Sequence, residues 1–288
     1  MSPQTPLLPT LNAAQTLTKQ YEPLGFVGAR KGAMMAGSDK FEIVVHGKGG
    51  HGASPQNTVD AVVVAASVVS ALQTVVSRSV DPLEPAVLTC GTIKGGFGYN
   101  IIADQVTVGG TTRCFSPAVQ GVIKERMRCI CEGVGGAFGA GVELKYTHGY
   151  PPTVNEDDAC LGFVRDAAAA VVGEARVKHD VITCGAEDFS YFLQQRPGTF
   201  FFVGAALPGE LRPHHKSVFD FDEGSLPITA SVFVHVCVSR ARPPPHVLAP
   251  SLTPFKHTRP NCAQGAWLQR PRRKTMTCIN AAFFRNMI

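Results

Sequence analysis

The sequence predicts a mixed α/β fold, in which a compact lobe of strands and helices is followed by part of a second α/β layer. Between residues 41 and 148, segments with strand and helix patterns follow in the order βαββαβ, the split βαβ or ferredoxin-like layout. Pro151 and Pro152 mark a boundary, and residues 149–239 hold helix patterns with only one or two short strands. After Ser239 the chain is rich in proline and has no hydrophobic period.

β-Branched residues and alternating hydrophobicity predict the strands of the lobe, and a 3.6-residue apolar period predicts its helices. The first helix is apolar nearly all round; its valines would suit a strand, but the run is too long for one. Such a helix is expected to be covered on two sides, by its own sheet and by another surface. The predicted elements are strand 41–45, helix 59–77, strands 86–93 and 105–113, helix 117–133 and strand 142–146.

Residues 149–239 do not complete an α/β layer, because two helices and one or two strands leave a sheet without partners. Residues 1–20 read as a loose arm, so residues 1–40 are too short to supply the missing strands. The predicted parts are an arm and domain remnant over 1–40, the lobe over 41–148, the C-terminal part of a larger domain over 149–239 and a disordered basic tail over 240–288. The predicted elements of 149–239 are helix 156–172, a loop 184–189 that opens a short helix, a strand within 198–204 and helix 222–238.

The net charge of +5 comes from the tail. From Arg240 onward there are nine basic residues and no acidic ones, which leaves 18 basic and 22 acidic residues in 1–239. A mildly acidic body predicts no nucleic-acid partner, and the basic run Arg270–Lys274 lies in a segment without a fold pattern. The most apolar stretch, Ala61–Leu72, is interrupted by two serines and is too short to span a bilayer.

The nine cysteines include no C-x-x-C pair, which predicts reduced thiols instead of a disulfide framework or zinc ribbon. The N-terminus shows no signal-peptide pattern. The sequence therefore predicts a soluble cytoplasmic protein with no membrane partner.

The loop Gly47–Gly52 fits the G-x-G-x-x-G pattern of dinucleotide binding, but its context does not. Residues 55–58 separate the loop from the helix, whereas a dinucleotide site needs the helix to begin at the loop. His51 is the informative residue, because bare glycines let the backbone approach a ligand or another chain closely. The alternative is a solvated loop histidine.

Asn100 and Arg113 offer an amide and a guanidinium near one end of the predicted sheet, a pair that suits a carboxylate; the alternatives are a turn cap and a surface ion pair. His214-His215 and Glu187-Asp188 are the metal-suggestive pairs. Adjacent residues rarely bind one ion together, so each pair offers one ligand. A catalytic zinc site needs three protein ligands, and residues 1–40 contain no His or Cys.

Taken together, these motifs resemble the metal-dependent aminoacylase/carboxypeptidase metallohydrolases, in the branch of hippurate hydrolases and auxin-conjugate amidohydrolases. The resemblance covers roughly residues 25–238. Its motifs are Gly28–Ala36, Gly47–Pro55, Asn100–Ile102, Gly110–Arg113, Gly149–Asn155, Gly185–Ser190, and His215 with Phe219–Glu223.

The resemblance implies a catalytic α/β domain into which a ferredoxin-like lid is inserted, and a homodimer formed through the lid helix and an edge strand. It implies amide cleavage of N-acyl amino acids with a divalent metal, zinc or manganese. His51 would be catalytic, reaching the partner's active site to stabilise the oxyanion. Asn100 and Arg113 would bind substrate and its carboxylate, His215 would be the last metal ligand, and Glu187 a supporting residue.

The sequence departs from the family in its first part. The other metal ligands and the general base belong upstream of the lid, and a further ligand His belongs before Gly25, where Thr18–Leu24 contains none. One His cannot hold a catalytic metal, so the metal is not expected to be retained. Two interpretations follow: an N-terminally truncated hydrolase, or a non-catalytic fragment that acts as a dimerisation module.

Overall fold

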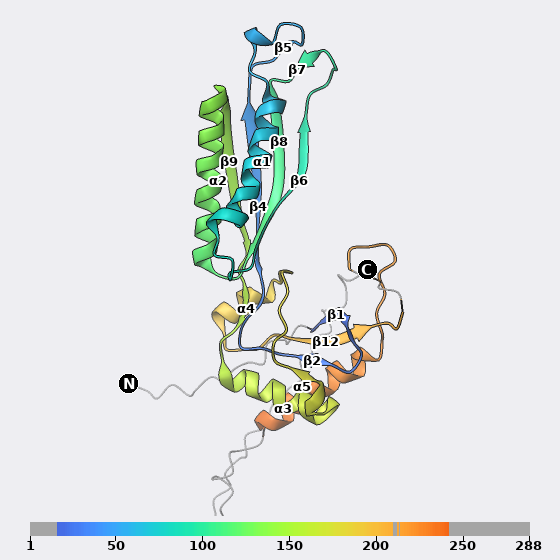
Figure 1. The fold of residues 1–288 in the computed structure, drawn as a ribbon. Helices are drawn as coiled ribbons and strands as arrows, with labels where there is room; N and C mark the ends of the chain where they lie inside the picture. The colour runs from blue at the N-terminus through green and yellow to red at the C-terminus, as the bar shows by residue number, and fades with distance from the viewer. Residues whose placement is uncertain (1–15, 210–211, 213, 242–288) are drawn as a thin grey trace, which may run out of the picture. The chain divides into compact units, whose positions relative to one another are not determined.

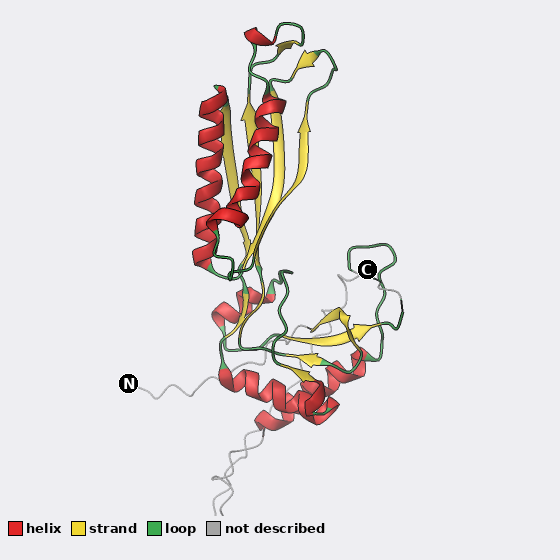
Figure 2. Ribbon diagram, viewed as in Figure 1, coloured by secondary structure: helices red, strands yellow, loops and turns green. Residues whose placement is uncertain are grey.

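The computed structural model describes residues 16–209, 212 and 214–241 of the 288-residue chain. The predicted tail, 240–288, lies outside these residues except for its first two positions, which continue a helix. The described part is a mixed α/β structure (Figure 2).

The lobe, which in the structure comprises residues 37–150, is a four-stranded antiparallel sheet with two helices on one face (Figure 1). The strand order is β6-β8-β4-β9, so β8 and β4 are central. Helix α1 contacts β6 and β8, and α2 contacts β9. The elements are β4 (Gly37–His46), α1 (Ala61–Ser79), β6 (Ala86–Gly95), β8 (Gln105–Cys114), α2 (Pro117–Phe138) and β9 (Gly141–Tyr150).

Side-chain caps fix where the two helices begin. The carboxylate of Asp60 accepts the backbone N–H of Val62 at 2.9 Å, and the hydroxyl of Ser116 caps α2 ahead of a proline. Helix α2 continues past its predicted end at Gly133. It stops at Gly139, whose φ of 68° is the left-handed conformation that closes helices and favours glycine. A glycine inside a helix weakens it but does not end it.

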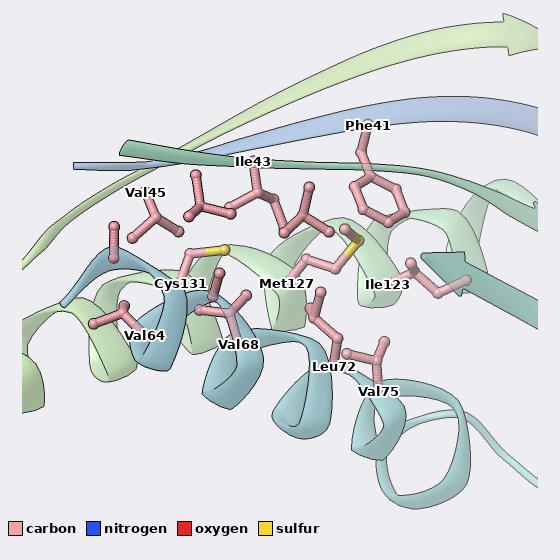
Figure 3. Close-up of a cluster of buried hydrophobic side chains, with 14 of the residues drawn as sticks. Phe41, Ile43, Val45, Val64, Val68, Leu72, Val75, Ile123, Met127 and Cys131 are labelled. Atoms are coloured by element: carbon pink, nitrogen blue, oxygen red, sulfur yellow. The ribbon is translucent and has the colours of Figure 1, made fainter. Parts of the chain in front are cut away.

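The core of the lobe lies between the sheet and the inner faces of both helices (Figure 3). Helix α1 is long and apolar enough to cross a membrane by composition alone, yet its inner face is fully buried in this core. Its outer face is different: Val62 and Val63 remain 46% and 49% exposed. The buried side chains include Ile43, Val45, Val64, Val68, Leu72, Val75, Ile123 and Met127.

A buried carboxylate joins the first strand of the lobe to its last. Asp39 is 3% exposed and accepts hydrogen bonds from Gln120 Nε2 at 2.6 Å, Tyr146 Oη at 2.7 Å and the Gly149 N–H at 2.9 Å. The Tyr146 hydroxyl uses its hydrogen atom in the bond to Asp39. The Thr112 hydroxyl is therefore the donor in its 2.7 Å hydrogen bond to Tyr146. Burial raises the pKa of Tyr146, so it stays a donor.

The second sheet shows that the prediction of a loose arm is wrong for the last residues of that arm. Residues 16–20 are not a loose arm: they begin β1, which pairs in parallel with β12, and β2 and β3 supply further strands. The sheet order is β1-β12-β2-β11, and β3 pairs separately with β10. These strands are β1 (Thr16–Pro23), β2 (Val27–Gly28), β3 (Gly32–Met35), β10 (Thr153–Asn155), β11 (Val177–Lys178) and β12 (Phe201–Ala206).

Three α-helices accompany this sheet, and they agree with the predicted segments within a few residues. Pro227 is tolerated because it lies in the first turn of its helix, where the missing N–H has no partner to lose. Buried Asn155 links β10 to the residue before β12: its Nδ2 donates to Phe200 O at 2.8 Å and its Oδ1 accepts from Phe200 N at 2.7 Å. The helices are α3 (Asp158–Val172), α4 (Phe189–Gln195) and α5 (Ser225–Ala241), with 3₁₀ turns η1 (Pro55–Asn57) and η2 (Glu174–Arg176).

Candidate functional site

The structure brings the loops of His51 and Asn100 together at one end of the lobe, called here the tip (residues 47–58 and 95–104; Figure 1). Two short strands join the two loops: β5 (Gly50–His51) pairs with β7 (Ile101–Ile102). The N–H of Gly52 also donates to the carbonyl of Asn100 at 2.8 Å. The two predicted site residues are therefore near neighbours.

The glycines of the tip make room for the chain's own backbone. A Cβ on Gly47 would lie 2.3 Å from the carbonyl oxygen of Val59, and one on Gly52 would lie 3.0 Å from that of Asn100. Close backbone packing therefore explains the G-x-G-x-x-G spacing, and it involves no phosphate.

A backbone contact that sequence patterns do not show fixes the tautomer of His51. The exposed His51 ring accepts the N–H of Ala53 at its Nδ1, at 3.0 Å. In a neutral imidazole the other nitrogen must then carry the proton, so Nε2–H is a donor. The tip thus presents a neutral hydrogen-bond donor beside the Asn100 segment.

Arg113 lies at the other end of the lobe, which corrects the expectation that it shares one end of the sheet with Asn100. In β8, Gln105 pairs with His46 near the tip, whereas Arg113 pairs with Ser38 and Val87. Arg113 is eight positions along the strand from Gln105, roughly 27 Å at about 3.4 Å per residue. One protomer cannot bring Arg113 and His51 to the same small ligand.

His215 and Glu187, the residues predicted to serve a metal site, lie outside the lobe, in the part of the structure that follows residue 150. His215 is exposed and has a φ of 63°, which is uncommon for a residue other than glycine, and the neighbouring His214 ring stacks on Phe219 at 4.6 Å between centroids. Glu187 is half-buried at the start of α4. Burial, and then the adjacent Asp188, raises the pKa of Glu187 to about 7.

Comparison with known proteins decides the family. The model of "Peptidase family M20/M25/M40" matches residues 52–239, more than half of the chain. The chain belongs to this family. The match includes most of the lobe and the helices and strands that follow it, so the M20 family accounts for both parts of the structure.

Relatives of this M20 chain include a protein named as a deacetylase and one named as an amino acid hydrolase. The chain is 38% identical over 217 residues to N-acetyl-L-cysteine deacetylase of Bacillus subtilis, covering 75% of this chain and 50% of the relative. It is 34% identical over 226 residues to IAA-amino acid hydrolase ILR1-like 2 of Arabidopsis thaliana, covering 75% and 50%. The chain therefore spans about half the length of these M20 relatives.

A solved M20 structure gives the same fold. The YXEP protein of Bacillus subtilis, a dinuclear metal-binding peptidase of the M20 family, matches with a TM-score of 0.62 at 28% identity. The alignment covers 78% of this chain and 55% of that one. The M20 fold therefore extends to the mixed α/β arrangement seen here.

The residues that the structure describes do not form a dinuclear metal centre. Within 16–209, 212 and 214–241, no three His, Cys, Asp or Glu side chains lie where they could hold one ion. Residues 1–15 contain none of these four types. A catalytic zinc needs at least three protein ligands, so no chemical step is assigned here to a bound metal.

The purified chain is therefore expected to carry less than one zinc or manganese ion per protomer. Elemental analysis after dialysis against metal-free buffer measures this ratio, with the dinuclear metal-binding YXEP protein of Bacillus subtilis as the comparison. One or two ions per protomer would contradict the expectation and would implicate ligands such as Glu187 or Cys184.

Proposed function

We propose that the chain acts in amide hydrolysis of N-acyl amino acids, with its lobe as the ferredoxin-like lid of an M20 amidohydrolase. The observation that carries the proposal is the fixed Nε2–H donor of His51 at the tip. The deacetylase and IAA-amino acid hydrolase relatives, both named for N-acyl amino acid substrates, support this substrate class. A cytoplasmic location, with no nucleic-acid or membrane partner, belongs to the same proposal.

The role of His51 follows from the charge that develops in amide cleavage. When the carbonyl carbon becomes tetrahedral, its oxygen gains negative charge and shortens its hydrogen bonds to waiting donors. The Nε2–H of His51 is such a donor, because Nδ1 accepts the Ala53 N–H and the ring is held in the required tautomer. Asn100 would help to hold the substrate beside it.

The separation of His51 from Arg113 favours a site shared by two protomers. An extended N-acyl amino acid is about two residues long, or about 7 Å, whereas the two side chains belong to opposite ends of the lobe. If Arg113 holds the substrate carboxylate, the oxyanion donor comes from a second copy. We therefore propose a homodimer in which each tip serves the partner.

The surface proposed for dimerisation is the outer face of α1 together with the edge strand β6. A groove of about 380 Å³ runs between them, lined by Ala66, Val69, Ser70, Cys90, Gly91, Thr92 and Ile93. Val62 and Val63, one turn earlier on the same helix, are half-exposed. An edge strand beside an apolar helix face can extend its sheet into that of a second copy.

A tetrahedral analogue tests the role of His51. The full chain is expected to bind a phosphonamidate analogue of an N-acetyl amino acid, and His51→Ala to weaken that binding at least about tenfold, because a hydrogen bond to a charged oxygen is lost. Binding of the parent amide should hardly change. Isothermal titration calorimetry measures both constants.

Two variants control this experiment. His51→Gln keeps a donor and should recover part of the affinity, whereas His179→Ala, an exposed histidine away from the tip, should change nothing. Equal losses for the analogue and the parent amide in His51→Ala would show that the residue shapes the site without stabilising an oxyanion.

A non-catalytic dimerisation module is the second candidate, favoured by the absence of a metal-ligand group in the described ranges. Hydrolysis of N-acetyl amino acids by the full chain with added zinc or manganese separates the two. Turnover that depends on His51 supports the hydrolase, whereas dimerisation without turnover or analogue binding supports the module.

A further inference from the structure

Large apolar side chains are exposed at both ends of the edge strand β6. Leu83, on the turn that leads into β6, is 90% exposed. Phe97 and Tyr99, on the loop that follows β6, are 82% and fully exposed. The turn and the loop lie at opposite ends of the lobe (Figure 1). Side chains of this size left in water at both ends of one edge strand indicate an interaction surface.

Both segments are fixed by hydrogen bonds of their own. In the turn, the carboxylate of Asp81 accepts the N–H of Leu83 at 2.9 Å, and the Asp81 carbonyl accepts the N–H of Glu84 at 2.9 Å. In the loop, the N–H of Ile101 donates to the carbonyl of Gly98 at 3.2 Å. Preformed segments lose little conformational freedom when a partner covers them.

We propose that the two segments cover each other across the homodimer, so that the turn 81–85 of one copy docks on the loop 97–99 of the other. The inference rests on the dimer of the proposed function, and it adds the register in which β6 meets its own copy. Each tip then receives Leu83 of the partner subunit next to the Asn100 segment.

The proposed dimer surface determines how the two strands run. Both copies of α1 lie on one face of a continuous sheet only when the two-fold axis is perpendicular to that sheet, and the two β6 strands are then antiparallel. In such a ladder the axis passes between one residue and its own copy. The end of β6 nearest the tip of one copy therefore meets the turn of the other.

The length of β6 determines the register. Its middle lies at Cys90 and Gly91. An axis at Cys90 places Phe97 opposite the partner subunit's Leu83. An axis at Gly91 places Tyr99 there instead. The bulge in the middle of β6 shifts the count by one residue, which leaves the opposite position within the loop.

The charges of the two segments are complementary. The turn carries the carboxylates of Asp81 and Glu84 and no basic residue, whereas Lys94 precedes a loop that has no acidic residue before Asp104. Within the described ranges neither Lys94 nor Glu84 forms a salt bridge. With the axis at Cys90, Lys94 lies about 7 Å along the strand from the partner subunit's Glu84, so their long side chains can meet. Such a pair adds little affinity but favours one register.

Exchange of the two charges tests the register. Lys94→Glu and Glu84→Lys are each expected to raise the dissociation constant of the dimer about three- to tenfold, because like charges then face each other twice in the dimer. Lys94→Glu/Glu84→Lys should return to within about twofold of the unmodified chain. Sedimentation equilibrium of the full chain measures these constants. Within one copy the two residues are separated by about 34 Å of extended chain, so a recovery reports a contact between copies.

Truncation of the apolar side chains tests the contact itself. Leu83→Ser and Phe97→Ser/Tyr99→Ser should each raise the dissociation constant at least about tenfold, because the contact occurs twice in the dimer. The triple variant should be no weaker than the weaker of these two, because both remove the same contact. Phe138→Ser is the control, since Phe138 is an exposed aromatic residue at the end of α2, and it should change nothing.

The outcomes separate this contact from the proposed function. Fully additive losses in the triple variant, or no recovery in the charge exchange, would overturn the contact. A dimer of unchanged strength in every variant would also overturn it, while leaving the homodimer and the hydrolase in place. An unmodified chain that is monomeric at micromolar concentration would reject the contact and the homodimer together, and the analogue titration of His51→Ala would still test the hydrolase separately.

Discussion

Gly110→Ala is expected to destabilise the lobe by about 3 kcal/mol or more, although alanine normally stabilises a strand relative to glycine by about 0.5–1 kcal/mol. The reason is space. A Cβ at this position would lie 2.2 Å from the carbonyl oxygen of Thr89 and 2.2 Å from Cζ of Phe41. The first atom is held by the β6–β8 ladder and the second lies in the core, so neither can move cheaply.

Gly109→Ala is the matched control on the same strand. Its Cβ would meet only the Thr92 hydroxyl, at 2.7 Å, and that exposed side chain can rotate away. Urea unfolding followed by circular dichroism compares the free energies of unfolding, and the control should stay within about 1 kcal/mol of the unmodified chain. Equal values for the two variants would mean that the sheet relaxes around Gly110.

Val62→Lys/Val63→Lys is expected to turn the proposed dimer into a monomer, with the dissociation constant raised by at least about 100-fold. Four ammonium groups would enter one apolar contact across the two-fold axis, where they repel one another and lose water. Both positions are half-exposed in the protomer, so the fold itself should survive. Light scattering over a range of micromolar concentrations measures the mass.

Val122→Lys controls for the added charge, because Val122 is also partly exposed but lies on α2, away from the proposed contact. It should leave the dimer intact. An unmodified chain that is monomeric at micromolar concentration would reject the lobe-mediated homodimer. A dimer that tolerates both lysines would place the interface elsewhere.

Sequence reasoning succeeded where structure is decided locally. The predicted helix 59–77 corresponds to α1, because its apolar residues and the capping Asp60 are neighbours in the chain. It failed at β1, whose partner is β12 near the other end of the described chain. The eight residues of β1 give no local sign of a partner so distant, which is why the sequence predicts a loose arm there.

The same distinction applies to the candidate site. The glycine-rich motif singled out His51, but the tautomer depends on a loop geometry at Ala53 that no spacing encodes. The position of Arg113 was within reach, since its predicted strand was long enough to carry it to the opposite end from Asn100.

The pairing of β1 with β12 has a consequence for the order of folding. Thr16 meets Phe201 with the whole lobe between them in the chain, whereas the strands of the lobe pair with nearer partners. Contacts of short sequence separation form faster, so the lobe should assemble first. At about 5–20 residues per second, synthesis leaves β1 without its partner for on the order of ten seconds. During that interval β1 exposes an unpaired strand edge, which a chaperone that binds extended segments would protect.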